Sequence, residues 1–222
     1  MGLKYLIIKI MKLQARLFRS YDRNLMHLLQ VKAVNETVEY VGQKMQNAVG
    51  LKGGRHEMFD FALSKIQNEG SVLEFGVAGG YSINYIGKKL NNKQVYGFDT
   101  FEGLPEAWGG YFYGESTYTQ YGKKPKVPDN VKLIIGLFED KILKFKETNN
   151  QQIIFLHVDC DIYSSTKTIF NLIGDRIRKN TIILFDEYFG YPNWQNHEFK
   201  AFQEFIKSSG FSYEYLPFNV IN

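Results

Sequence analysis

The sequence predicts an α/β fold in which helices cover both faces of a parallel sheet. Short apolar runs predict buried strands at residues 71–77, 94–98, 131–135, 152–158 and 181–185. Helical stretches lie between these runs, and strands that alternate with helices form parallel sheets with right-handed crossovers. Glycines or acidic residues lie at or just after the end of each run. In such sheets, ligands bind just outside the carboxyl ends of the strands.

Two of the predicted strands lead into pairs of acidic residues. Asp159 and Asp161 follow the run at 152–158, and Asp186 and Glu187 follow the run at 181–185. Carboxylates that converge at one edge of a sheet repel one another unless a cation or shared protons intervene. A hard divalent cation prefers oxygen ligands, so the pattern predicts a metal site. The alternative is that these acids cap helices or pair with Lys or Arg at the rim of the sheet.

A glycine-rich turn follows the strand at 71–77. Gly76, Gly79 and Gly80 allow the backbone to turn tightly and to approach a ligand closely. Asp99, at the end of the next strand, is placed to hydrogen-bond the hydroxyls of a ribose. A dinucleotide site is one interpretation, but the strict G-x-G-x-x-G pattern is absent. Glu74, two residues before the first glycine, is instead typical of S-adenosylmethionine sites.

Four segments resemble a known enzyme family. They are EFGVAGGYS (74–82), FDTFEGLPE (98–106), VDCDIYSST (158–166) and FDEY (185–188). Together they are similar to the macrocin O-methyltransferase-like group of class I S-adenosylmethionine-dependent methyltransferases, over roughly residues 51–216. The chain departs from that pattern at Glu187, where members often carry a second Asp. The resemblance implies a Rossmann-like sheet and a metal-dependent methyl transfer to a hydroxyl of a sugar or natural product.

The resemblance also implies roles for individual residues. Mg²⁺ or another hard divalent cation is expected on Asp159, Asp186 and Glu187, with Asp161 as the general base. The cofactor is expected to contact a second set, which comprises Glu74, Gly76, Gly79, Gly80, Ser82, Asp99 and Thr100. His197 is a further candidate for substrate contact or proton transfer. We expect His157 to support the acids without ligating the metal, and Cys160 to be a buried core thiol.

Composition agrees with one enzyme domain and restricts its partners. The net charge is +4, but residues 1–24 hold six basic residues and one acidic residue, so the rest of the chain is close to neutral. A basic stripe of the kind that binds nucleic acid is therefore not expected. The single cysteine excludes an intrachain disulfide and favours a reducing compartment, so we expect a cytoplasmic protein.

We expect a helical N-terminal extension at 1–50 and an S-adenosylmethionine-binding methyltransferase domain at 51–222. Residues 3–48 show a helical pattern, but the first apolar stretch is too short and too charged to span a bilayer. We favour a helix that packs on its own domain or on a partner subunit, and the second case would form a homo-oligomer. The alternative is contact with an anionic membrane surface.

Predictions also apply to three further segments. The aromatic loop at 108–122 suits a substrate lid or, equally, a surface loop whose rings pack on the domain edge. The stretch at 188–198 must cross the acidic edge of the sheet. Residues 211–218 predict a sixth strand, which leaves an antiparallel seventh strand short or absent.

Two other function classes stay open at this stage. One is a nucleotide-dependent oxidoreductase on a similar sheet, against which the missing glycine pattern argues. The other is a non-catalytic scaffold that retains the pocket.

Overall fold

The computed structural model describes residues 6–13, 24–110 and 113–220. A central sheet of five parallel strands has the spatial order β4-β3-β2-β5-β6. The strands are β2 (Ser71–Phe75), β3 (Val95–Asp99), β4 (Val131–Ile135), β5 (Ile153–Val158) and β6 (Ile177–Phe185). Each strand overlaps a predicted one, and the predicted α/β fold is confirmed. β6 begins earlier than predicted, through a polar stretch that the apolar pattern did not include.

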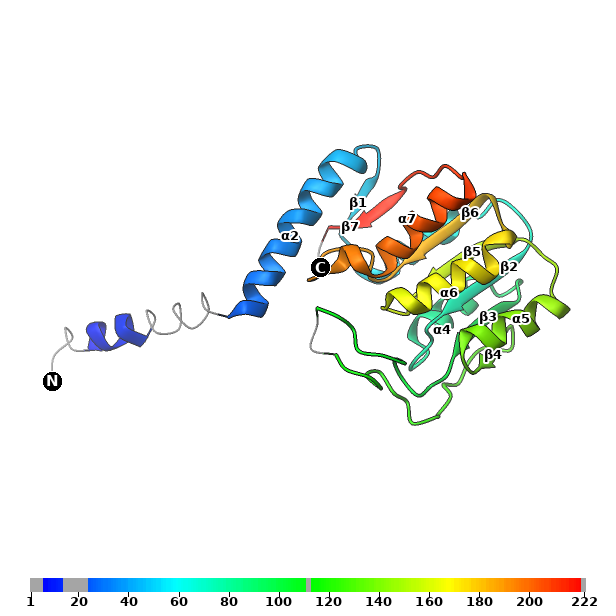
Figure 1. Cartoon of the computed structure of the whole chain (residues 1–222), viewed down its shortest axis with the longest axis horizontal. Coiled ribbons are helices and arrows are strands. Elements are labelled where there is room, and N and C mark those ends of the chain that lie inside the picture. Colours follow the sequence, from blue (N-terminus) through cyan, green and yellow to red (C-terminus); the bar gives the residue numbers. More distant parts are fainter. Residues whose placement is uncertain (1–5, 14–23, 111–112, 221–222) are drawn as a thin grey trace.

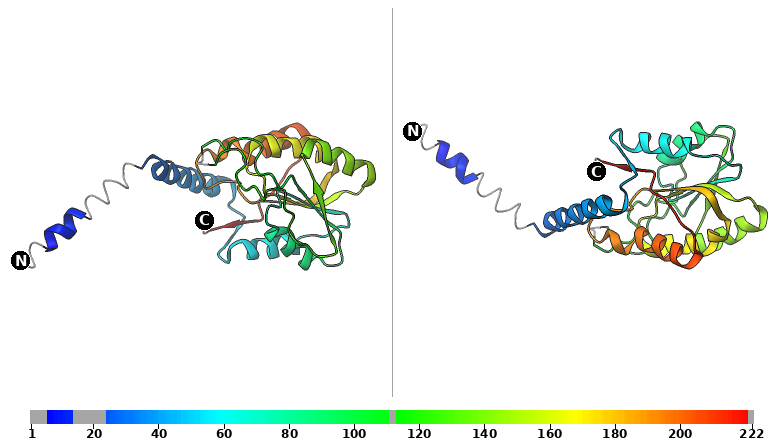
Figure 2. Two further views of the ribbon diagram at one scale, coloured as in Figure 1. Left: turned by 90° about the horizontal axis from the view of Figure 1, so that it is seen from below. Right: turned by 90° about the horizontal axis from the view of Figure 1, so that it is seen from above.

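Helices cover both faces of the sheet (Figures 1 and 2). One face packs against α5 (Phe138–Thr148), α6 (Tyr163–Ile173) and α7 (Glu198–Ser209), and the other packs against α3 (Gly54–Ser64) and α4 (Tyr81–Lys89). Side chains of successive β2 residues point alternately into the hydrophobic cores on the two faces of the sheet. Leu73 and Phe75 pack with α5–α7, whereas Val72 packs with α3 and α4. This alternation follows from the pleat of a strand and sets which residues face the site.

Backbone hydrogen bonds continue beyond the ends of the central strands. The Asp159 N–H donates to the Phe75 carbonyl (2.9 Å), and the Asp186 N–H donates to the Val158 carbonyl (3.0 Å). These bonds keep the residues after β5 and β6 in step with their neighbours. The two acidic pairs therefore lie side by side at one edge of the sheet.

The N-terminal extension is helical in part. Residues 6–13 are helical, and α2 spans Leu25–Lys44, while the expected helix at 3–5 and 14–23 lies outside the described residues. Residues 45–48 leave the helix, and Val49–Leu51 form strand β1. The prediction of helix was thus wrong after residue 44. The partner of β1 is at the other end of the chain, so the local pattern did not reveal it.

The predicted strand at 211–218 is wrong over most of its length. β7 covers only Pro217–Asn219, and it pairs in parallel with β1 in a separate two-stranded sheet. In the preceding segment, the Tyr215 hydroxyl bonds to the hydroxyls of Tyr40 and Tyr188. Within the described residues, no antiparallel strand joins the central sheet.

One face of α2 packs on the domain. Gln30 donates to the Gly190 carbonyl (2.6 Å), and the Gly190 N–H donates to the Thr37 hydroxyl (3.0 Å). Other α2 side chains, including Leu25 and Val38, are exposed. None of the helices described is both long and apolar enough to cross a membrane.

Candidate active site

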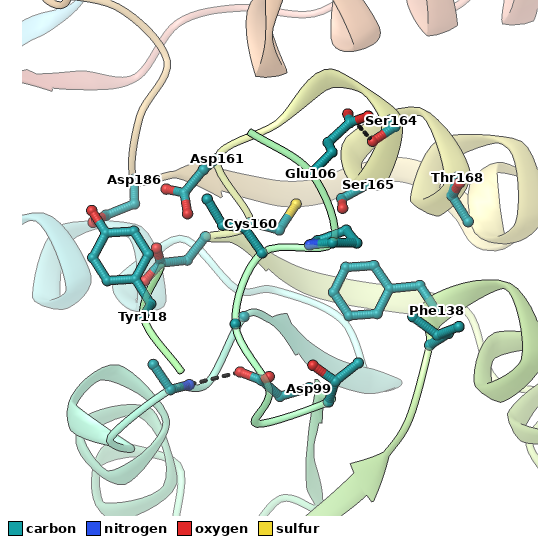
Figure 3. Close-up of a pocket in the computed structure, with 18 of the residues that line it drawn as sticks. Asp99, Glu106, Tyr118, Phe138, Cys160, Asp161, Ser164, Ser165, Thr168 and Asp186 are labelled. Carbon is teal, nitrogen blue, oxygen red and sulfur yellow. Dashed lines mark hydrogen bonds between the residues drawn. The ribbon is translucent and has the colours of Figure 1, made fainter. Parts of the chain in front are cut away.

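A cavity of about 640 Å³ lies at the carboxyl ends of the central strands (Figure 3). Its wall includes the glycine turn after β2, the acids that follow β3, β5 and β6, and the first turns of α6. The predicted site residues that line it are Gly76, Asp99, Thr100, Asp159, Asp161, Asp186 and Glu187. The remaining predicted residues, which are Glu74, Gly79, Gly80, Ser82 and His197, are not in this wall.

The carboxylate of Asp99 stabilises the glycine turn by accepting hydrogen bonds from its backbone. Its Oδ2 accepts hydrogen bonds from the N–H groups of Val77 and Ala78, both at 2.7 Å, and its Oδ1 accepts one from Phe101 N–H at 2.7 Å. These bonds hold Ala78 and Phe101 in left-handed conformations, with φ of 42° and 62°. A carboxylate offers about four acceptor positions, so Oδ1 can still accept a bond from a ligand in the cavity.

Glu74 lies below the cavity and is fully buried. Its Oε1 accepts a hydrogen bond from the Ser82 hydroxyl (3.0 Å), and its Oε2 lies 3.1 Å from Nδ1 of His157. Burial raises the pKa of Glu74, and the contact with His157 opposes that rise. The structure thus brings Glu74 and Ser82 together, but places both within a buried polar network at the base of the glycine turn.

The acids after β5 and β6 form one crowded cluster. Burial, followed by repulsion from Asp186, raises the pKa of both Asp159 and Glu187 well above the usual range. The same causes raise the pKa of Asp161 to about 7, although its hydrogen bond with Glu187 partly offsets this rise. Single ligand atoms from Asp159, Asp161 and Glu187 lie within 4.8 Å of one another. The cluster therefore has the spacing of a cation site, and ionisation of all its acids would require a compensating cation.

Residues of the 108–122 and 188–198 loops meet beside this cluster. Trp108 is buried and packs edge-on against Tyr191, whereas Tyr118 of the same loop lines the cavity. The packing of Trp108 agrees with a surface loop whose rings pack on the domain, and the substrate lid stays a prediction. His197 is buried, and its Nε2 lies 2.7 Å from the carbonyl oxygen of Gly109, which accepts its hydrogen bond. The side chain of His197 therefore joins the two loops, and its predicted catalytic role stays a prediction.

The comparisons with known proteins agree with this geometry. Residues 73–188 match the family described as a methyltransferase domain. This chain belongs to that family. The predicted methyltransferase is thereby confirmed, and the family favours methyl transfer over the oxidoreductase alternative.

Solved structures of other methyltransferases share the fold. The calicheamicin methyltransferase CalS11 is 22% identical with a TM-score of 0.55, and the match covers 68% of this chain and 71% of that chain. The O-methyltransferase NovP is 17% identical with a TM-score of 0.52, and the match covers 72% of this chain and 75% of that chain. At these identities, both comparisons support the fold alone. A search of curated proteins gave no match.

Two charged residues of this methyltransferase site were missed in the sequence. Arg55, at the start of α3, forms an ion pair with Asp186 and lines the cavity. Burial lowers the pKa of Arg55, but the charges of Asp186, Asp159 and Glu187 outweigh that effect and raise it. Only the fold brings Arg55 to these acids, which lie more than 100 residues further along the chain, so no local signal could have found it.

Glu198 is the second missed residue. It is fully buried at the start of α7, and its Oε1 accepts hydrogen bonds from the N–H groups of Cys160 (3.3 Å) and Asp161 (3.2 Å). Asp161 has a φ of 64°, a conformation that costs a non-glycine residue about 1–3 kcal/mol. Glu198 thus stabilises the backbone that presents the Asp161 carboxyl group. Cys160 itself is buried in the core, as predicted.

Proposed function

We propose that this chain is an S-adenosylmethionine-dependent, divalent-metal-dependent O-methyltransferase of the macrocin-like type. Its acceptor is a hydroxyl of a sugar or of a natural-product-like small molecule. The observation that carries the proposal is the acid cluster in the wall of a cavity that also contains the glycine turn. The acceptor class is supported by a second solved structure of CalS11, which is 23% identical with a TM-score of 0.50 and is described as a TDP-rhamnose 3'-O-methyltransferase.

The cofactor end of the cavity is built by the glycine turn and the end of β3. Asp99 and Thr100 would bind the ribose, and the backbone at Gly76, Gly79 and Gly80 would approach the methionine part. Glu74 and Ser82 shape the base of this turn through their mutual hydrogen bond. Bound S-adenosylmethionine supplies an already activated methyl group. The protein's own contribution is then to align the acceptor oxygen and remove its proton.

The acid end of the cavity fits a divalent cation. Burial raises the pKa values of Asp159, Asp161 and Glu187, and Oε2 of Glu187 is buried without a hydrogen-bond partner among the described residues. Asp159, Asp186 and Glu187 would hold the cation, which would lower the pKa of an acceptor hydroxyl. Asp161 would accept the proton of that hydroxyl, because it lines the cavity and its backbone is fixed by Glu198.

Cofactor binding tests this function directly. S-adenosylhomocysteine should bind the wild-type protein in calorimetry, and Asp99→Ala should weaken it because the ribose hydrogen bonds and the closed glycine turn are both lost. NADH is the comparison ligand. Tighter binding of NADH than of S-adenosylhomocysteine would show that the cofactor is misassigned, and turnover that EDTA leaves intact would exclude the metal.

The exposed apolar residues of the N-terminal helices support a proposal about assembly. Leu6, Ile10 and Met11 in the helix at 6–13, and Leu25 and Val38 in α2, are all exposed. We propose that they pair with a second copy of the chain, in a cytoplasmic homo-oligomer. Contact with an anionic membrane surface is the competing outcome.

A further inference from the structure

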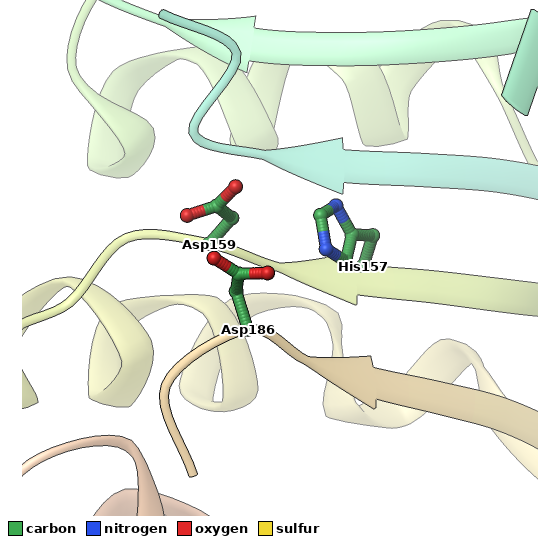
Figure 4. A group of neighbouring side chains, drawn as sticks. All are labelled: His157, Asp159 and Asp186. Carbon is green, nitrogen blue, oxygen red and sulfur yellow. The ribbon is translucent and has the colours of Figure 1, made fainter. Parts of the chain in front are cut away.

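His157 is a buried histidine beside the acid cluster that the proposed chemistry does not use. It lies on β5 directly across from Glu74 on β2, and its side chain is 1% exposed. Figure 4 shows its ring next to Asp159 and Asp186, with one ring nitrogen turned toward these acids. A buried imidazole at this position needs a partner for each of its two nitrogens.

Among the described residues, only one of the two nitrogens has a hydrogen-bond partner. Nδ1 lies 3.1 Å from Oε2 of Glu74, and the other oxygen of Glu74 accepts a hydrogen bond from Ser82. A carboxylate accepts hydrogen bonds, so in the neutral imidazole it holds the proton at Nδ1 and leaves the lone pair on Nε2. Nε2 is buried and has no hydrogen-bond partner. The network thus prepares Nε2 as a ligand atom.

The nearest candidate ligands complete a cation site. One ligand atom each from His157, Asp159 and Asp186 lie within 4.8 Å of one another. A histidine that donates its second N–H to a carboxylate is the usual arrangement around a protein-bound metal, because the carboxylate fixes the tautomer and the ring orientation. The Arg55 guanidinium that pairs with Asp186 is half-exposed, so it can move aside for a cation.

We propose that His157 ligates the metal through Nε2, together with Asp159 and Asp186, and that Glu74 positions it. The site then takes a first-row transition cation, such as Co²⁺, Fe²⁺ or Zn²⁺, in preference to Mg²⁺, because imidazole suits these ions and Mg²⁺ prefers oxygen. This inference rests on the proposed metal-dependent function. It gives Glu74 a role in the metal site, in place of a direct contact with the cofactor.

Pulsed electron paramagnetic resonance tests the ligand without relying on activity. The protein is labelled with ¹⁵N-histidine and loaded with Mn²⁺ as the probe. Directly bound imidazole should give a ¹⁵N coupling, which His157→Gln abolishes. His27→Gln is the matched control, since His27 is on α2 and not in the cluster, and it should keep the coupling. Absence of a ¹⁵N coupling in Mn²⁺-loaded wild-type protein overturns the proposal, whether or not the variants fold.

Metal selectivity separates a ligand from a merely structural histidine. By calorimetry, His157→Gln should lower the Co²⁺ affinity by about tenfold or more while changing the Mg²⁺ affinity much less. Glu74→Gln should lower the Co²⁺ affinity by about 10–100-fold, because a neutral amide raises the basicity of the imidazole less than a carboxylate does. Equal losses for both cations would overturn the proposal. Failure of wild-type protein to bind either cation would overturn the metal-dependent function as well, whereas Mg²⁺ binding without a ¹⁵N coupling overturns the histidine ligand alone.

Discussion

Gly76 links the glycine turn to the acid cluster by direct contact, so Gly76→Ala should damage both. A Cβ at Gly76 would lie 1.6 Å from the carbonyl oxygen of Asp159, whereas real Cβ contacts under 3.0 Å essentially never occur. The φ of Gly76 is +92°, which a residue with a side chain rarely adopts. The Asp159 backbone must therefore shift, and its carboxylate must move away from the proposed metal.

The stability cost can be worked from these two conflicts. Backbone strain at such a φ costs about 1–3 kcal/mol, and overpacking costs about 1–3 kcal/mol more. Together they predict a loss of about 2–6 kcal/mol. For a domain of this size, each kcal/mol lowers the melting temperature by about 2–4 °C, so a fall of roughly 4–24 °C is expected. Thermal unfolding of the ligand-free protein measures it, and a Mn²⁺ titration should show weaker binding.

Gly79→Ala is the matched control in the same turn. No atom lies within 4 Å of a Cβ at Gly79, and its φ is outside the left-handed region. Its melting temperature should change by no more than about 2 °C, as for an open surface site. A cofactor that approaches this backbone closely would still bind Gly79→Ala less tightly. If Gly76→Ala melts within about 2 °C of wild type, the close approach of the turn to Asp159 is wrong.

Four further predictions follow from the same geometry. Asp161→Asn should lower the rate of methyl transfer by about a hundredfold or more, and rising pH, but not excess metal, should reduce this defect. Asp159→Asn should instead weaken metal binding, and its activity should recover partly at high metal concentration. Rescue of Asp161→Asn by metal would show that Asp161 is a metal ligand. Glu198→Ala should destabilise the fold by about 1–3 kcal/mol and slow methyl transfer, because two buried N–H groups lose their acceptor. Glu198→Gln keeps an acceptor oxygen, so it should retain wild-type stability and the wild-type rate of methyl transfer. Burial raises the pKa values of Asp159, Asp161 and Glu187, so the metal-free protein should lose stability as pH rises through these values, about 7 for Asp161. A divalent cation should restore the melting temperature near about pH 8 but not near about pH 5. A melting temperature that rises with pH in EDTA would contradict the repulsion between these acids. Deleting residues 1–24 should reduce the number of copies in the oligomer, as measured by light scattering, and leave cofactor binding intact. An unchanged oligomer with lost binding to anionic vesicles would instead support contact with a membrane surface.

Much of the fold was readable because its signals are local. Each central strand contains a short apolar run, and the acids or glycines at its end mark the edge at which the cavity lies. The errors lie where pairing joins distant parts of the chain. β1 and β7 are three residues each and are separated by most of the sequence, so neither carries a strand pattern strong enough to show the pair.

The sequence by itself determined that Asp159, Asp161, Asp186 and Glu187 meet at one edge of the sheet, because parallel strands end on the same side. Only the tertiary structure decided which groups they meet there. Arg55 reaches Asp186 from α3, Glu198 reaches the Asp161 backbone from α7, and His157 pairs with Glu74 across two strands. Charge and hydrogen-bonding capacity are properties of single residues, but the partner that satisfies a buried polar group is set by packing between elements far apart in the chain.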